Sequence, residues 1–93
     1  MQCDFMYVIK RKGHKEKFDE RKVYGSVYAA CKICEMPEKN CEKIAKSVSK
    51  GIKSMVKKKN IVSSEDIFRN VVKILKKHHK DAAFMYETHR DVS

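Results

Sequence analysis

The residues best suited to metal or redox chemistry are the cysteines, and three of the four lie close together in the sequence. Cys31 and Cys34 have the CxxC spacing of a zinc-ligand pair, and Cys41 follows seven residues later. A structural zinc ion needs four ligands, usually supplied as two close pairs. No second CxxC or HxxxH pair is present, so Cys3 or a distant histidine would have to complete the set. Because free cysteine is among the most frequently buried residues, we expect packed thiols and no metal site.

Motifs for catalysis are absent from the sequence. The three glycines are isolated, so neither a P-loop nor a dinucleotide-binding loop can be formed. The four histidines have no nucleophile spaced to pair with them, and the carboxylates are scattered. The sequence therefore indicates a binding protein and not an enzyme.

A series of lysines recurs every three or four residues in the middle of the chain: Lys43, Lys46, Lys50, Lys53 and Lys57. This spacing places them on one side of a helix, where they could follow the phosphates of a nucleic acid or form an ordinary solvated face. No arginine or aromatic residue interleaves with them, although base stacking normally uses both. We favour the solvated face. A small basic nucleic-acid-binding or transcription-regulatory protein is the alternative function.

Composition sets the frame for these residues. The 93-residue chain carries 22 Lys and Arg against 12 Asp and Glu, a formal net charge of +10. That charge favours anionic partners, which include nucleotides, nucleic acid and membrane surfaces. With 42% apolar residues, three glycines and one proline, the composition is that of a globular protein. We expect a single domain over residues 1–93, with its core at about 6–90.

The sequence gives no sign of a membrane or export segment. Its longest apolar run has five residues, far fewer than a membrane span needs. The N-terminus lacks the basic region and apolar stretch of a secretory signal. We therefore expect a cytoplasmic protein with no membrane partner.

The first half of the chain is predicted to form a hairpin and a helix. Residues 5–11 have apolar side chains on both faces of a strand, and a turn at 12–13 lets residues 14–18 return as a second strand. Asp19 is suited to be the N-cap of the helix that follows, and Pro37 lies beyond its end. The apolar positions of this helix are Val23, Tyr24, Val27, Tyr28, Ala30, Cys31 and Cys34.

The second half is predicted to be mainly helical. A second helix begins near Glu38, and residues 60–62 are suited to a third strand. Ser63 or Ser64 can cap a third helix, and Asp81 can cap a fourth. The apolar face of the second helix is Cys41, Ile44, Val48, Ile52 and Met55. The predicted fold class is α+β, with about four helices packed against a small three-stranded sheet that includes an N-terminal β-hairpin.

Three segments together resemble the ATP-cone family. Residues 8–23, VIKRKGHKEKFDERKV, are similar to its opening signature, in which a Lys-Arg strand and a turn precede a Glu, an apolar residue, an Asp and a helical Lys. Residues 62–67, VSSEDI, resemble the start of its third helix, and residues 82–90, AAFMYETHR, its closing helix. Each motif alone is unspecific, but the three follow the family's order over about residues 6–90.

The resemblance implies a function. ATP-cones occur in ribonucleotide reductase large subunits and in a bacterial repressor of their genes, where they bind ATP or dATP and report it through quaternary contacts. It therefore implies a non-catalytic regulatory module that binds ATP or dATP, with Mg²⁺. The module would act by forming homo-oligomers or by docking onto a partner such as a ribonucleotide reductase or transcription regulator. Nucleic acid is the second choice of partner.

The resemblance also implies a set of nucleotide-binding residues. Val8 would line the base pocket, Lys10 and Arg11 would meet the phosphates, and the remaining positions are Glu16, Asp19, Lys22 and Ser64. Simpler roles are open to some of them, as edge-strand charges for Lys10 and Arg11 and as helix caps for Asp19 and Ser64. The sequence departs from the family pattern at Lys12, where Asp is usual, at Phe68, where a polar residue is usual, and after Arg90, where a basic residue is missing.

Overall fold

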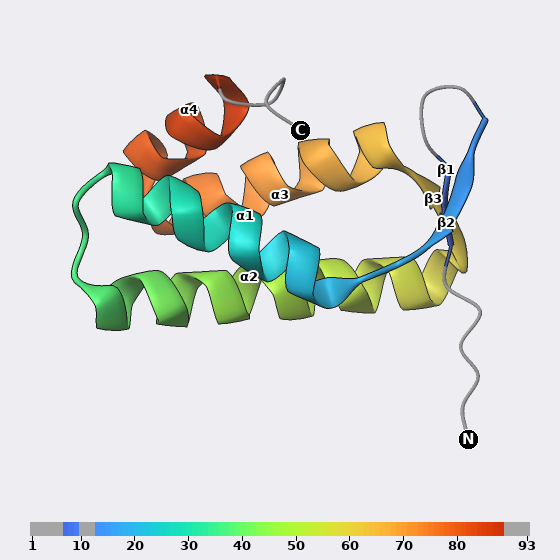
Figure 1. Ribbon diagram of the computed structural model, residues 1–93, viewed down its shortest axis with the longest axis horizontal. Coiled ribbons are helices and arrows are strands. Elements are labelled where there is room, and N and C mark those ends of the chain that lie inside the picture. The colour runs from blue at the N-terminus through green and yellow to red at the C-terminus, as the bar shows by residue number, and fades with distance from the viewer. Residues whose placement is uncertain (1–6, 10–12, 89–93) are drawn as a thin grey trace.

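A computed structural model describes residues 7–9 and 13–88 of the chain. Within them it has three short strands and four helices in the order β1, β2, α1, α2, β3, α3, α4. The strands lie at one end of the helices, and α1 and α2 run side by side in opposite directions (Figure 1). The predicted α+β class, with four helices and a small three-stranded sheet, is therefore confirmed.

The sheet has the strand order β2-β1-β3. β1 (Tyr7–Ile9) pairs antiparallel with β2 (Lys15–Lys17) and parallel with β3 (Ile61–Ser63). Gly13 has a φ of 77°, a left-handed conformation that glycine adopts without steric cost and that helps the chain to turn between the hairpin strands. The predicted third strand is confirmed, and the paired Val8 and Val62 both face the core.

The most extensive contact between helices joins α1 (Glu20–Ile33) and α2 (Glu38–Lys59). The side chain of Asp19 accepts a hydrogen bond of 3.0 Å from the backbone N–H of Arg21, so the predicted N-cap is confirmed. α1 ends one residue before Cys34, and α2 begins directly after Pro37, whose fixed φ suits a helix start.

The expected serine cap of the third helix is confirmed, whereas the start of the fourth helix differs from the expectation. α3 (Ser64–His78) is capped by Ser63, whose hydroxyl accepts from the N–H of Asp66 at 3.0 Å. α4 (Lys80–Thr88) begins two residues earlier than an Asp81 cap would place it, and the Nδ1 atom of His79 accepts from the N–H of Ala82 at 3.1 Å. The expected cap, Asp81, instead lies inside the first turn, where its negative charge interacts favourably with the helix dipole.

The core is formed mainly between the helices, with one valine each from β1 and β3. In α2 the buried face is rotated slightly from the predicted one, since Ala45 and Val56 are fully buried while Ile44 and Met55 are partly buried. The fully buried large side chains are Val27, Cys31, Cys41, Val48, Ile52, Val56, Val71 and Leu75. No helix of the described residues is long and apolar enough to cross a bilayer.

Candidate functional site

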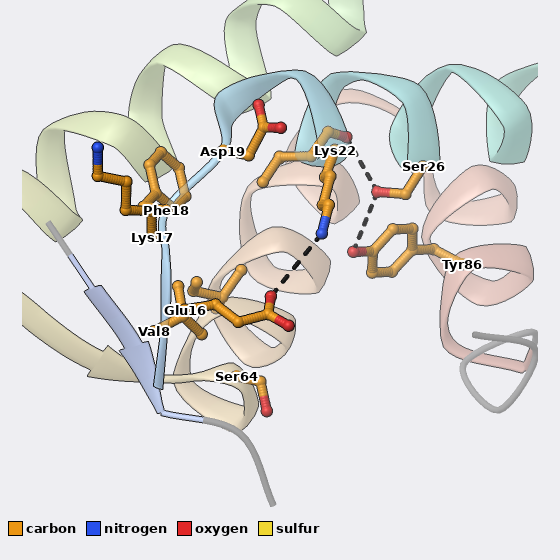
Figure 2. Close-up of a pocket in the computed structure, with 11 residues that line it drawn as sticks. Val8, Glu16, Lys17, Phe18, Asp19, Lys22, Ser26, Ser64 and Tyr86 are labelled. Atoms are coloured by element: carbon orange, nitrogen blue, oxygen red, sulfur yellow. Dashed lines mark hydrogen bonds and ion pairs between the residues drawn. The ribbon is translucent and has the colours of Figure 1, made fainter. Parts of the chain in front are cut away.

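A cavity of about 270 Å³ lies where the sheet meets α1, α3 and α4 (Figure 2). Its wall is partly apolar and partly charged or hydroxylated. It is lined by Val8, Glu16, Lys17, Phe18, Asp19, Lys22, Val23, Ser26, Ser64, Ile67 and Tyr86. Such a mixture of an apolar wall with a few polar groups is typical of small-molecule sites.

Five of the seven residues singled out in the sequence line this one cavity. Val8 comes from β1 and Glu16 from β2, while Asp19 and Lys22 come from the start of α1. Ser64 is the first residue of α3. Segments almost 50 residues apart are joined here because β3 pairs with β1, which brings the start of α3 to the hairpin. Lys10 and Arg11 lie outside the described residues.

The charges at the cavity are arranged across its mouth. The Nζ atom of Lys22 lies 3.8 Å from the Oε1 atom of Glu16, and the Lys22 side chain is 71% exposed (Figure 2). An exposed ion pair at this distance contributes little to stability, about 0–1 kcal/mol. The Lys22 ammonium can therefore exchange this contact for an anionic ligand at small cost.

Asp19 has two roles in this geometry. It caps α1, and it lines the cavity. A hydrogen bond from the Arg21 side chain and a second from the Arg21 backbone lower the pKa of the Asp19 carboxyl, so the group is ionised at neutral pH. The capping role does not exclude a role in binding.

The sequence left open whether Ser64 caps the third helix or contacts the nucleotide. Ser63 caps α3, whereas Ser64 follows it and lines the cavity. The alternative of Ser64 as a mere cap is therefore wrong. The reason is a one-residue shift, because the cap position precedes the first helical residue.

Sequence reasoning missed the contribution of α4 and of Ser26 to the cavity. The hydroxyl oxygens of Ser26 and Tyr86 lie 3.3 Å apart, and the Tyr86 ring stacks on Phe68 with centroids 5.7 Å apart. Burial raises the pKa of the Tyr86 phenol, partly opposed by the hydrogen bond with Ser26. Phe68, where the family usually has a polar residue, does not line the cavity but stacks on Tyr86, which does.

The cysteines lie away from the cavity, where α1 and α2 join. Cys31 and Cys41 are fully buried, and Cys34 is half-buried. Burial, with a smaller contribution from Cys41 and Cys34 nearby, raises the pKa of the Cys31 thiol to about 11. A thiol held neutral in this way is a poor nucleophile and metal ligand. The described residues contain no group of three metal-binding side chains.

Comparison with protein families and with curated proteins gives two findings. The family model of the ATP cone domain matches residues 6–91. A search of the curated proteins gives no significant match.

Proposed function

Because this chain belongs to the ATP-cone family, whose members are nucleotide-binding regulatory modules, we propose that its cavity binds ATP or dATP with Mg²⁺. The observation that carries this proposal is the convergence of Val8, Glu16, Lys22 and Ser64 from four separate elements on one cavity.

The composition of the cavity suggests how the nucleotide lies. Val8, Val23 and Ile67 offer apolar surface to a base, and Glu16 and Ser64 offer hydrogen-bonding groups to the adenine or ribose. At about 270 Å³ the cavity is small for a complete nucleoside triphosphate. The phosphates would therefore extend out of it.

Basic residues are the natural ligands for those phosphates. Lys22 stands at the mouth of the cavity, and Lys10 and Arg11 follow β1 directly in sequence. Charged hydrogen bonds of this kind are the strong ones, and an arginine can bind a phosphate through two N–H groups. We propose that Lys10, Arg11 and Lys22 hold the phosphates, with Asp19 fixing the start of α1.

The family is regulatory and non-catalytic, and we propose that this chain does not hydrolyse the nucleotide. The signal would be a change in association, either between copies of the chain or with a partner such as a ribonucleotide reductase or a transcription regulator. Each nucleotide bound with one Mg²⁺ brings a net charge of about −2 to a chain of +10. Binding therefore lowers the repulsion between like-charged copies.

Calorimetric titration with ATP, dATP and ADP in the presence of Mg²⁺ tests binding directly. A ligand that binds only the folded state also raises the melting temperature as its concentration rises. We expect both signals for ATP or dATP, without release of inorganic phosphate. No binding heat and no melting shift at millimolar nucleotide would refute the proposal.

Light scattering at constant ionic strength tests the proposed output. We expect the average particle mass to increase when ATP or dATP is added. A constant mass at saturating nucleotide would contradict self-association and leave docking to a partner as the output.

A further inference from the structure

The outer face of α2 carries a dense line of positive charge. We call it the lysine stripe and define it as Lys39, Lys43, Lys46, Lys50, Lys53 and Lys57. All six are exposed, and at about 100° per residue they fall within an arc of about 80° on the helix. They extend over about 27 Å of its length. The buried face of α2 points the other way, into the core.

Few carboxylates neutralise this line. Over the span of the stripe, residues 39–57 contain six lysines and one carboxylate, Glu42, and residues 43–59 contain seven lysines and no Asp or Glu. Among the described residues, the stripe has one ion pair, in which the Nζ atom of Lys53 lies 3.4 Å from the Oε1 atom of Glu20 on α1. A helix face that is merely solvated usually mixes both signs of charge, since pairs spaced by four residues stabilise it. The uniform sign here costs repulsion along the helix.

Packing against α1 adds a groove beside the stripe. Its volume is about 400 Å³, and it is lined by Tyr24, Lys39, Glu42, Lys43 and Lys46. Tyr24 stacks on Tyr28, with ring centroids 6.1 Å apart. An aromatic ring therefore lies next to three lysines, although no aromatic residue interleaves with them in the sequence.

The stripe is separate from the nucleotide cavity. No residue of α2 lines that cavity. A ligand on the outer face of α2 therefore meets residues other than those that hold the nucleotide, and the two sites can be tested independently.

We propose that the lysine stripe binds the sugar-phosphate backbone of nucleic acid. A regular line of single-sign charge complements a polymer that presents phosphates at regular intervals. Because the stripe presents one kind of cationic group at regular intervals, it matches the repeating phosphates and not a pattern of bases, and we expect binding that is independent of sequence. Tyr24 supplies a ring at one end of the line, beside Lys39, Lys43 and Lys46.

Two other kinds of partner, an anionic membrane and another protein, fit the surface less well. A membrane-binding helix buries an apolar face in the lipid, but the apolar face of α2 is already buried in the protein core. Protein interfaces are poor in lysine and have apolar or aromatic residues at their centre. The centre of the stripe, around Lys46 and Lys50, is rich in lysine and offers no apolar or aromatic residue.

The test is fluorescence anisotropy with labelled 24-base-pair DNA duplexes of two unrelated sequences, a single strand of the same length, and an RNA duplex. We expect similar affinity for both DNA sequences. If the stripe contacts four to six phosphates, the slope of log K against log salt on duplex DNA is about −4 to −5. Preference among the duplexes and the single strand identifies the nucleic acid that supplies the phosphates.

Matched variants separate the stripe from the general charge. The variant Lys43→Gln/Lys46→Gln/Lys50→Gln removes three stripe charges, and Lys73→Gln/Lys76→Gln/Lys80→Gln removes three exposed charges from α3 and α4. Both lower the formal net charge from +10 to +7. We expect the stripe variant to bind DNA at least tenfold more weakly, with a slope of log K against log salt that is less negative by about 2–3. The control variant should lose about twofold or less in affinity.

Thermal melting followed by circular dichroism shows whether both variants are folded, and we expect cooperative transitions close to that of the wild type. Equal losses in the two variants would show that binding rests on net charge alone and would overturn the proposal. So would a wild-type protein that binds none of these nucleic acids at 50 mM salt, or one that binds phosphatidylserine vesicles in their place.

Discussion

The cavity and the lysine stripe are built in opposite ways. The cavity gathers residues from β1, β2, α1, α3 and α4, and its groups differ in charge, size and hydrogen-bonding capacity. The stripe comes from one helix and repeats one chemistry. In the cavity, each residue occupies a place that no other can fill, so single changes should have large effects. In the stripe the contacts add up, so effects should grow with the number of charges removed.

The largest effect is expected from the residues proposed to hold the phosphates. Lys10→Ala and Arg11→Ala should each weaken ATP or dATP binding roughly ten- to a hundredfold, because a hydrogen bond to a charged group contributes about 1.5–3 kcal/mol. The double variant should lose more than a hundredfold. Isothermal titration calorimetry measures the affinities.

Lys50→Ala is the matched control, since it removes the same charge from the centre of the stripe. It should leave the affinity for nucleotide within about twofold. An equal loss in Lys50→Ala would show that nucleotide binds to diffuse positive charge, and the contrast between the two regions would be lost.

The same contrast explains what the sequence could and could not predict. Helices, the hairpin and the third strand follow from local patterns, and so does the stripe, because periodicity along one helix suffices to place its members on one face. The cavity depends on the contact of β3 with β1 and of α4 with α1, which no local pattern encodes. Glu16 and Ser64 were predicted as site residues only because the sequence resembles the ATP-cone family.

Two aromatic residues show where the missing information lies. Tyr86 lies in the segment that resembles the family's closing helix, but only tertiary packing sets its hydroxyl beside Ser26 at the cavity. Tyr24 was assigned to the buried face of α1, yet it also borders the groove beside the stripe. Sequence periodicity gives the face of a helix, whereas its neighbours are decided by how the helices cross.

The next effect concerns the core that both regions share. The Cys31 thiol has a pKa of about 11 in the folded protein against an ordinary value of 9.0, so the unfolded chain releases this proton first as pH rises. The free energy of unfolding is therefore not reduced by this group below pH 9. It falls by about 2–3 kcal/mol as the pH rises from 9 towards 11, because the unfolded chain is then stabilised by ionisation of the thiol. Urea unfolding at several pH values between 7 and 11 measures the loss.

Cys31→Ala should be less stable at neutral pH but should lose less stability between pH 9 and 11. Cys34→Ala, which removes a half-buried thiol close by, should keep most of the wild-type slope. If the slope is the same in all three proteins, the alkaline loss comes from other groups and Cys31 does not titrate as its burial requires.

A smaller effect is expected from Tyr86→Phe. The change removes the hydroxyl that lies 3.3 Å from Ser26 but keeps the ring stacked on Phe68. The lost intramolecular hydrogen bond should lower the stability of the protein by about 0.5–1.5 kcal/mol. If the Tyr86 hydroxyl also bonds to the nucleotide, the affinity for nucleotide should fall by roughly two- to tenfold. DNA affinity should not change. The reverse result, an effect on DNA and none on nucleotide, would place α4 with the stripe.

The smallest effect compares two glycines, one in the helix that borders the cavity and one in the helix that carries the stripe. Gly25 lies on the exposed face of α1, and a Cβ added there meets no atom within 4 Å. Gly25→Ala should therefore stabilise the protein by up to about 1 kcal/mol, the difference in helix propensity. At Gly51 in α2 the added Cβ lies 3.1 Å from the Cδ1 atom of Ile74 on α3. That methyl group ends a flexible, partly buried side chain, so it can move by a few tenths of an ångström.

We accordingly expect Gly51→Ala to stabilise by less than Gly25→Ala, about 0.5 kcal/mol, which is roughly 2–4 °C in melting temperature for a chain of this size. The difference between the two variants measures how tightly α3 is packed against α2. Neither variant should change the affinity for nucleotide or DNA, because neither residue lines the cavity or belongs to the stripe. Destabilisation by Gly51→Ala would mean that Ile74 cannot give way. The helix carrying the stripe would then be locked to the helix whose first residue lines the cavity, and the two regions would not be mechanically independent.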